Sequence, residues 1–188
     1  RRQRQMCIRD SVKGMNKLGD DFSANRVFVP EMLIAARCMS AATELLKPHM
    51  VGEGGESATV GSAVIGTVRG DMHDIGKNLV KIMMEGSGIE VYDLGTDVSA
   101  EQFVETAVEH DCGIIACSSL LTTTMNEMRR VVSLAQEKGI RKKVRILIGG
   151  APISQSFCDE IGADVYTEDA GAAARAAVEM LKTCQNGK

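Results

Sequence analysis

The sequence predicts an α/β fold in which a doubly wound, flavodoxin-like, five-stranded parallel sheet follows a short helical segment. Short apolar runs rich in β-branched residues predict strands at 64–68, 90–94, 113–117, 144–148 and 163–166. Amphipathic stretches between and after them predict helices at 75–85, 100–110, 125–138, 154–161 and 170–182. Five strand–helix units in a row favour a parallel sheet with helices on both faces, because parallel neighbours need crossover connections.

Two helices are expected before the sheet. One runs from about residue 30 to 47, because apolar residues recur there at the helical period between Pro30 and Pro48, which begin and end it. The other covers roughly residues 8–18 and precedes a loop at 19–29. A glycine- and glutamate-rich linker lies near residues 51–61. The expected division is a helical cap with linker at 1–55 and an α/β domain at 56–188.

Composition excludes several classes of function. The net charge of −3 and the pI near 5.7 give no reason to expect nucleic acid or a membrane as partner. No run approaches the roughly 18–20 apolar residues of a membrane span. The six cysteines show no CxxC pair and no regular spacing, so we expect a reducing cytoplasm rather than a disulfide framework. The basic residues at the start of the chain indicate a frayed or artificial terminus.

The loop after the first predicted strand contains a histidine close to an aspartate. In doubly wound sheets, ligands bind outside the carboxyl ends of the strands, near a switch in strand order. His73 is therefore accessible to a ligand, and imidazole is a common metal ligand. Asp71 can bond the ring nitrogen that the metal does not use. Taken alone, such a pair is more often a structural hydrogen bond, and Asp74 equally suits a helix cap.

Two further loops carry unusual residues. After the third predicted strand, residues 118–124 include five serines and threonines, more than helix capping explains. After the fourth, Gly149 and Gly150 allow either a tight turn or a ligand lying against the backbone. The glycines at 66, 70 and 76 match neither a dinucleotide nor a phosphate-loop pattern. Paired carboxylates or a Ser–His–Asp order for hydrolysis are not evident.

Together the three loops resemble the DxHxxG…SxL…GG signature of cobalamin-binding domains, through Asp71-x-His73-x-x-Gly76, Ser118-x-Leu120 and Gly149-Gly150. The run 70–78 is similar to that of cobalamin-dependent methionine synthase and of small corrinoid proteins in methanol, methylamine and glycine betaine methyltransferase systems. Residues 28–31 and the Met/Ala-rich stretch after them resemble the helical cap of those proteins. The resemblance covers residues 12–182. Their cap is a bundle of about four helices, so the two expected here predict a shortened or truncated cap.

The resemblance implies a role for each matching position. His73 binds cobalt from below in place of the cofactor's own base, with Asp71 and Thr124 completing a hydrogen-bonded relay. The remaining cofactor-binding positions fall into four groups. They are the loop residues Met72, Asp74 and Ile75; the tail-binding Ser118, Thr122, Tyr166 and Asp169; Leu120, Gly76, Gly149 and Gly150, which line or leave space for the tail; and Phe28, Met32 and Ala36, an apolar lid over the upper cobalt face.

The implied function is a corrinoid methyl carrier that binds cobalamin base-off/His-on. It shuttles a methyl group between a substrate-specific methyltransferase and a second methyltransferase, with a reductive activase as a further partner. The chain shows no methyltransferase barrel, so a carrier rather than a complete enzyme is expected. Two alternatives stay open: the cobalamin-binding subunit of an adenosylcobalamin mutase, against which the helix after Pro30 argues, and a non-enzymatic cobalamin sensor. The sequence does not identify the methyl donor.

Overall fold

The structure, a computed structural model, describes residues 13–15, 17–50 and 60–185 and contains a parallel five-stranded sheet. The strand order is β2-β1-β3-β4-β5, and every neighbouring pair is parallel. The predicted doubly wound α/β fold is therefore confirmed. Chain order reverses its direction across the sheet between β1 and β3, which makes their carboxyl ends the switch point. The strands are β1 (Gly61–Thr67), β2 (Ile89–Asp93), β3 (Ile114–Ser118), β4 (Arg145–Gly149) and β5 (Val165–Thr167).

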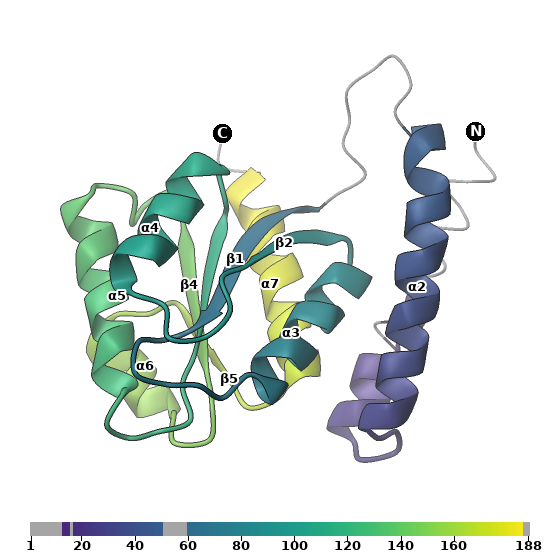
Figure 1. Cartoon of the computed structure of the whole chain (residues 1–188), viewed down its shortest axis with the longest axis horizontal. Helices are drawn as coiled ribbons and strands as arrows, with labels where there is room; N and C mark the ends of the chain where they lie inside the picture. The colour runs from purple at the N-terminus through teal and green to yellow at the C-terminus, as the bar shows by residue number, and fades with distance from the viewer. Residues whose placement is uncertain (1–12, 16, 51–59, 186–188) are drawn as a thin grey trace.

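Helices cover both faces of this sheet (Figure 1). One face packs against α3 (Ile75–Gly86) and α7 (Ala170–Gln185). The other packs against α4 (Ala100–Glu109), α5 (Met125–Glu137) and α6 (Gln155–Ile161). These helices begin within one residue of their predicted starts.

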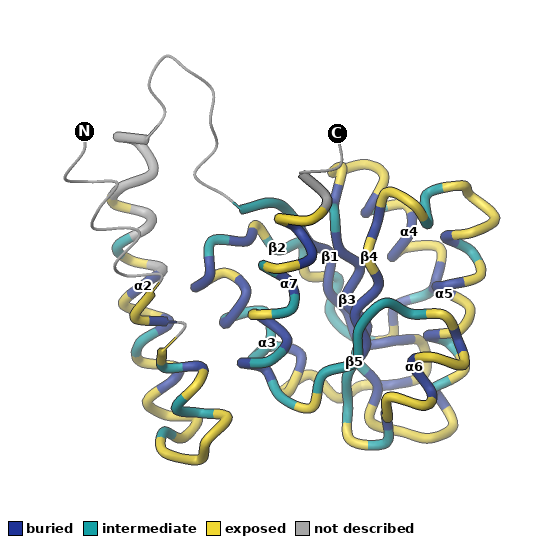
Figure 2. The backbone as a smooth tube through the Cα atoms, turned by 180° about the vertical axis from the view of Figure 1, so that it is seen from behind, coloured by how far each residue is buried: buried dark blue, intermediate teal, exposed yellow. Residues whose placement is uncertain are grey.

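The side chains of the strands alternate between two apolar layers. In Figure 2, buried residues run along the central strands β1, β3 and β4. Val64 and Ile115 face α4 and α5, whereas Ile65 and Ile114 face α3 and α7. All four are at most 2% exposed. Burying each such side chain contributes roughly 1.5–3 kcal/mol, which explains why β-branched runs identify the strands.

The helical segment packs on the α3–α7 side of the sheet. It consists of helical residues 13–15 and 17–23, followed by α2 (Val29–Met50). Figure 1 shows α2 beside α3. Asp20 forms an ion pair with Arg175 of α7 at 2.9 Å. At Gly19, an added Cβ would lie 2.9 Å from the Met83 methyl group of α3, so the two segments approach closely.

Two expected boundaries in this segment are wrong. The helix continues to residue 23, whereas a loop was expected from residue 19. The expected loop began at Gly19, but in the structure Gly19 lies within the helix and leaves room for the Met83 side chain. Helix α2 continues two residues beyond Pro48, because a proline in the last turn removes only one backbone donor. Residues 8–12 and most of the expected linker (51–59) lie outside the described residues, and the division near residue 55 stays a prediction.

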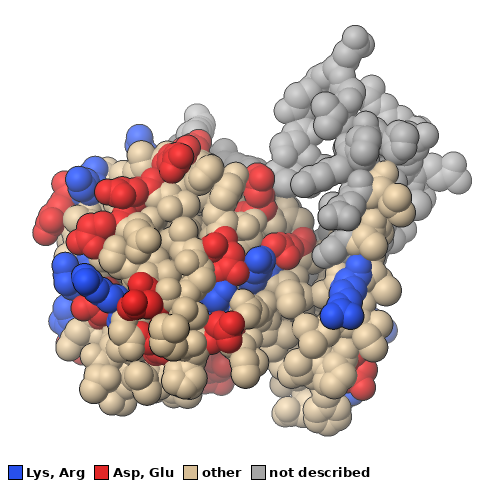
Figure 3. Space-filling view, in the orientation of Figure 1, with Lys and Arg blue, Asp and Glu red and all other residues tan. Residues whose placement is uncertain are grey.

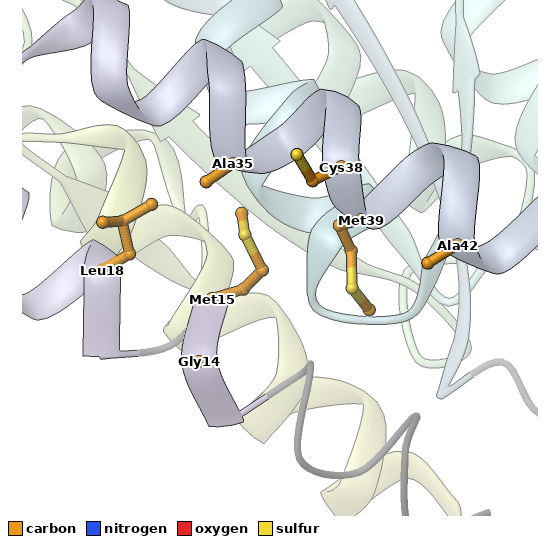
Figure 4. Close-up of a pocket in the computed structure, with 7 residues that line it drawn as sticks. All are labelled: Gly14, Met15, Leu18, Ala35, Cys38, Met39 and Ala42. Carbon is orange, nitrogen blue, oxygen red and sulfur yellow. The ribbon is translucent and has the colours of Figure 1, made fainter. Parts of the chain in front are cut away.

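An apolar groove of about 430 Å³ lies between the helical residues Gly14, Met15 and Leu18 and α2 (Figure 4). The expected cofactor-binding residues do not line it. Its walls are Gly14, Met15, Leu18, Ala35, Cys38, Met39 and Ala42.

The three residues expected to form a lid differ in their exposure. Met32 is fully buried and Ala36 is 6% exposed, and both belong to the core cluster that includes Met15 and Met83. Phe28 is 64% exposed just before α2. Met32 and Ala36 therefore stabilise the packing of the helical segment. Phe28 alone of the three is accessible in this arrangement, and contact of any of them with a cofactor stays a prediction.

Charged side chains are mixed in sign on the face shown in Figure 3, where the described Lys and Arg residues are interspersed with Asp and Glu. Within residues 13–15, 17–50 and 60–185, no helix combines the length and apolarity needed to cross a bilayer.

We expect Met32→Ala to lower the free energy of unfolding by about 2–5 kcal/mol, because it leaves a cavity in the core. Phe28→Ala should change it by less than about 0.5 kcal/mol, because that side chain is exposed. Urea unfolding followed by circular dichroism measures both. Equal, small effects would contradict the burial of Met32.

Candidate functional site

The loops after β1 and β3 meet at the switch point of the sheet. Thr67 and Ser118 are paired at the ends of the two strands, and the Val68 N–H donates to the Ser118 carbonyl at 3.0 Å. This pairing brings residues 68–74 beside residues 119–124. The expected ligand position at the carboxyl edge thus unites two of the three sequence fragments.

Asp71 is the centre of the site. Its side chain is fully buried, and one carboxylate oxygen accepts hydrogen bonds from the N–H groups of Leu120 (2.7 Å) and Leu121 (3.2 Å). The other oxygen accepts from the His73 N–H at 3.0 Å. The Asp71 carboxylate therefore joins the loop after β1, which carries it, to the loop after β3.

These donors determine the protonation state of Asp71. Burial alone raises a carboxyl pKa. The hydrogen bonds from the Leu120 N–H, from the backbone and ring of His73, and from the Leu121 N–H overcome this effect and hold the pKa of Asp71 well below its usual range. Asp71 is therefore ionised at neutral pH and can only accept hydrogen bonds.

His73 is oriented by this carboxylate. Its Nδ1 lies 2.9 Å from Asp71 Oδ1, so an ionised Asp71 assigns the ring proton to Nδ1. In the neutral imidazole, Nε2 then carries the free lone pair that a metal can use. The side chain is 55% exposed, whereas Asp71 is 0% exposed. The pair combines a buried orienting group with an accessible imidazole.

Thr124 and Ser119 complete a hydroxyl cluster beside Asp71. Thr124 occupies the N-cap position of α5 but makes no capping bond with its side chain. Its Oγ1 instead donates to Asp71 Oδ2 at 3.2 Å and lies 2.8 Å from Ser119 Oγ. Thr124 therefore contacts Asp71, and its part in a relay stays a prediction. Ser119 is buried in this cluster and was not predicted, whereas its half-buried neighbour Ser118 was.

Thr67 is a second residue that the sequence interpretation missed. It ends β1, is fully buried, and donates its hydroxyl proton to the His73 carbonyl at 2.7 Å. The sequence did offer a signal for Thr67, because a residue with a hydroxyl group ends the strand that leads into the loop of His73.

The surface around His73 is apolar and open. Met72 is 70% exposed, Ile75 81%, Leu120 41% and Leu121 40%. A Cβ added at Gly76 would meet no atom within 4 Å. Exposed apolar side chains gathered around a single imidazole fit a large, flat, partly apolar ligand that carries its own metal.

Asp74 occupies the N-cap position of α3 without making a capping bond through its side chain. Its Oδ2 instead accepts from the Asn78 side chain at 3.1 Å. The alternative interpretation of Asp74 as a side-chain helix cap is therefore wrong.

The two glycines at the end of β4 lie close to neighbouring backbone. A Cβ at Gly150 would lie 1.8 Å from the Ser119 carbonyl oxygen, and φ there is +138°. A Cβ at Gly149, the last residue of β4, would lie 3.3 Å from the Thr167 carbonyl oxygen of β5. Gly150 therefore lets the loops after β3 and β4 approach each other, and contact of either glycine with a cofactor tail stays a prediction.

The other predicted tail-binding residues lie outside the hydrogen bonds described around Asp71. Thr122 is exposed, and Tyr166 packs partly buried against the α4–α6 layer. Asp169 accepts from the Ala172 N–H at 2.8 Å and from Ser23 Oγ at 3.0 Å. It therefore caps the start of α7 and bonds to the helical segment.

Comparison with known families matches both parts of the chain. The model described as B12 binding domain matches residues 61–179, and a second model of the same description matches residues 8–47. The chain belongs to the B12-binding corrinoid proteins. Dimethylamine corrinoid protein 1 of Methanosarcina acetivorans is 45% identical over 168 residues, which cover 89% of this chain and 78% of that protein.

Two solved structures share the family's overall arrangement. A cobalamin-binding protein from Desulfitobacterium hafniense matches with a TM-score of 0.78 and 33% identity, over 98% of this chain and 82% of that one. The methanol:cobalamin methyltransferase complex MtaBC of Methanosarcina barkeri matches with a TM-score of 0.80 and 30% identity, over 93% of this chain and 66% of that one. The matched length includes most of the helical segment as well as the sheet domain.

We expect Asp71→Asn to lower the free energy of unfolding at neutral pH by about 1–3 kcal/mol, because the amide cannot satisfy the donors that converge on the carboxylate. Folding lowers the pKa of Asp71, so its ionic contribution is complete above the unfolded-state value of about 3.9 and is lost as pH falls below it. The difference between wild type and variant should therefore be constant above about pH 5 and shrink below about pH 4.

Urea unfolding of the cofactor-free protein across this pH range checks the prediction. The same substitution at exposed Asp74 is the matched control and should change the free energy of unfolding at neutral pH by less than about 0.5 kcal/mol. A difference between wild type and Asp71→Asn that does not vary with pH would contradict it.

Proposed function

We propose that this chain is a corrinoid methyl carrier in which His73 is the lower axial ligand to cobalt. The observation that carries the proposal is the Asp71–His73 pair, because a buried, ionised carboxylate leaves Nε2 of an accessible imidazole free to bind metal. When bound, the corrin supplies a cobalt centre that holds and transfers the methyl group.

The residues of the chain then control ligation and access. Asp71 orients His73 and fixes its tautomer, while Thr124 and Ser119 provide hydroxyl groups through which a proton can reach or leave the carboxylate. Thr67 holds the backbone of His73. The apolar side chains around His73 exclude water from the lower side of the corrin.

The cofactor binds base-off, with its own nucleotide base displaced by His73 and its tail beside the loops after β3 and β4. Gly76 supports this placement, since its open surroundings leave room at the start of α3. Ser118, Thr122 and Leu120 are the tail contacts on the other side. The helical cap at 1–55 shields the upper face with Phe28, and the domain at 56–188 holds the cofactor.

The names of the relatives suggest the partners. Proteins named for dimethylamine are 41–45% identical to this chain, against 30% for the methanol complex, which favours a methylated amine as donor. A substrate-specific methyltransferase would load the methyl group, a second would accept it, and a reductive activase would restore oxidised cobalt. A mutase subunit is disfavoured because the matched MtaBC structure covers the helical segment together with the sheet domain.

The test is electron paramagnetic resonance of the cobalamin-reconstituted protein in its Co(II) state. An axial nitrogen splits the cobalt lines into triplets, and nitrogen-15 labelling of histidine should turn them into doublets. His73→Ala should abolish histidine ligation and shift the visible spectrum toward the base-off form, while the corrin stays bound through its tail.

The matched control is His110→Ala. His110 stacks on Tyr92 with ring centroids 4.0 Å apart and is not part of the Asp71 cluster, so its loss should leave the triplet-to-doublet change intact. Triplets that persist with labelled histidine would mean that the cofactor's own base is the lower ligand. Failure to retain any corrin after gel filtration would refute corrinoid binding itself.

A further inference from the structure

The loop between β2 and α4 contacts the segment that carries Asp71 and His73. Asp97 in this loop makes two hydrogen bonds to that segment: its Oδ1 accepts from the Gly70 N–H at 2.7 Å, and its own N–H donates to the Asp71 carbonyl at 3.0 Å. Asp97 has a φ of +56°, in the left-handed region. This conformation lets one residue present both its side-chain acceptor and its backbone donor.

The loop that carries Asp97 is itself held on both sides. The Thr67 N–H donates to the Gly95 carbonyl at 2.9 Å, and the Val98 N–H donates to the Thr67 carbonyl at 3.0 Å. The Asp93 carboxylate accepts from the Gly95 N–H at 2.9 Å and pairs with buried Lys77 at 2.6 Å. Asp97 thus projects from a loop that is bonded to both β1 and α3.

The segment that Asp97 holds turns through a glycine at its beginning, and there the Asp71 N–H also donates to the Val68 carbonyl at 3.1 Å. Gly70 is exposed with φ +80°, and a Cβ there would approach the Thr124 methyl group at 3.3 Å, so the chain turns through a glycine at this point. At the other end, Thr67 holds the His73 carbonyl. The segment 70–73 is therefore held at its start by Asp97 and at its end by Thr67.

We propose that Asp97 is a positioning residue that sets how strongly His73 binds cobalt. The inference rests on the proposed function, because it requires His73 to be the axial ligand. A segment fixed at both ends presents the imidazole in one place, and releasing Gly70 lets it adopt conformations in which the ring cannot reach the metal. Asp97 acts through Gly70 and Asp71 and does not touch the cofactor.

Two substitutions isolate the side-chain acceptor. Asp97→Gly tolerates the left-handed backbone but removes the acceptor. Asp97→Asn also tolerates this backbone, removes the same charge and keeps an Oδ1 acceptor. The matched control is Asp111→Gly, since Asp111 has φ +47° and lies in an exposed loop at the opposite edge of the sheet.

The measurements are the Co(II) electron paramagnetic resonance spectrum with labelled histidine and the Co(II)/Co(I) midpoint potential of each reconstituted protein. Losing one hydrogen bond should weaken histidine ligation about fivefold. Because histidine stabilises Co(II) and not Co(I), a fivefold loss raises the potential by about 40 mV for a one-electron couple. Asp97→Asn and Asp111→Gly should stay close to wild type.

An Asp97→Gly protein with the wild-type potential and spectrum would overturn the inference, as would an Asp97→Asn protein that shifts as far as Asp97→Gly. An Asp97→Gly protein that does not fold, judged by circular dichroism without cofactor, would also overturn it, because Asp97 would then hold the fold rather than the ligand. If the wild-type spectrum lacks splitting from histidine, the proposed function fails, and the inference about Asp97 fails with it. If the wild-type spectrum shows the histidine splitting and Asp97→Gly leaves both spectrum and potential unchanged, only the role of Asp97 is refuted.

Discussion

The burial of one ionised carboxylate organises the rest of the site. Removing a charge from water is costly unless donors replace the lost hydration, and Asp71 receives them from the two loops at the switch point. Neither loop can move away without leaving the carboxylate unsatisfied. The pairing of β1 with β3 is therefore linked directly to the orientation of His73, and the fold specifies the direction of the imidazole through one side chain.

Elements whose signal is local could be predicted from the sequence. The central strands β1, β3 and β4 are largely buried on both faces, so their apolar runs stand out, and the helices between the strands show a clear period. His73 and Asp71 lie two residues apart, which is enough to predict their hydrogen bond. Ser119 and Thr67 could not be identified in this way, because their importance depends on which side chains face Asp71 and the His73 carbonyl across paired strands. The sequence interpretation named Ser118, whereas the adjacent Ser119 lies beside Asp71. Side-chain direction reverses at each residue along a strand, so an error of one residue selects a side chain that points the other way.

The glycines show how one sequence pattern can arise from different physical requirements. Gly150 has no room for a side chain because the Ser119 carbonyl lies against it, whereas Gly76 has open space around it. The family resemblance gives Gly76 and Gly150 the same role, that of leaving space for a ligand. Only the atoms around each glycine in the structure show that their requirements differ. The helical segment poses a similar difficulty. Periodicity predicted that Met32 and Ala36 share a face of α2, but the element against which that face packs depends on contacts with α3 and α7, such as that of Gly19 with Met83.

The division between buried and exposed groups has a chemical consequence. A carrier must offer its metal to more than one partner, so the metal-binding face has to be accessible while the ligand stays oriented. Here the orienting groups Asp71, Thr67 and Ser119 are fully buried, whereas the imidazole is half exposed among apolar side chains. Packing holds the buried groups in single conformations, so the hydrogen bond to Asp71 gives the accessible ring a fixed direction. The helical segment packs on α3 and α7, and its Ser23 also bonds to Asp169 in the loop after β5. The hydrogen bonds described for Asp71 and His73 come instead from the loops after β1 and β3 and from β1, so the orientation of His73 is governed by a separate set of contacts.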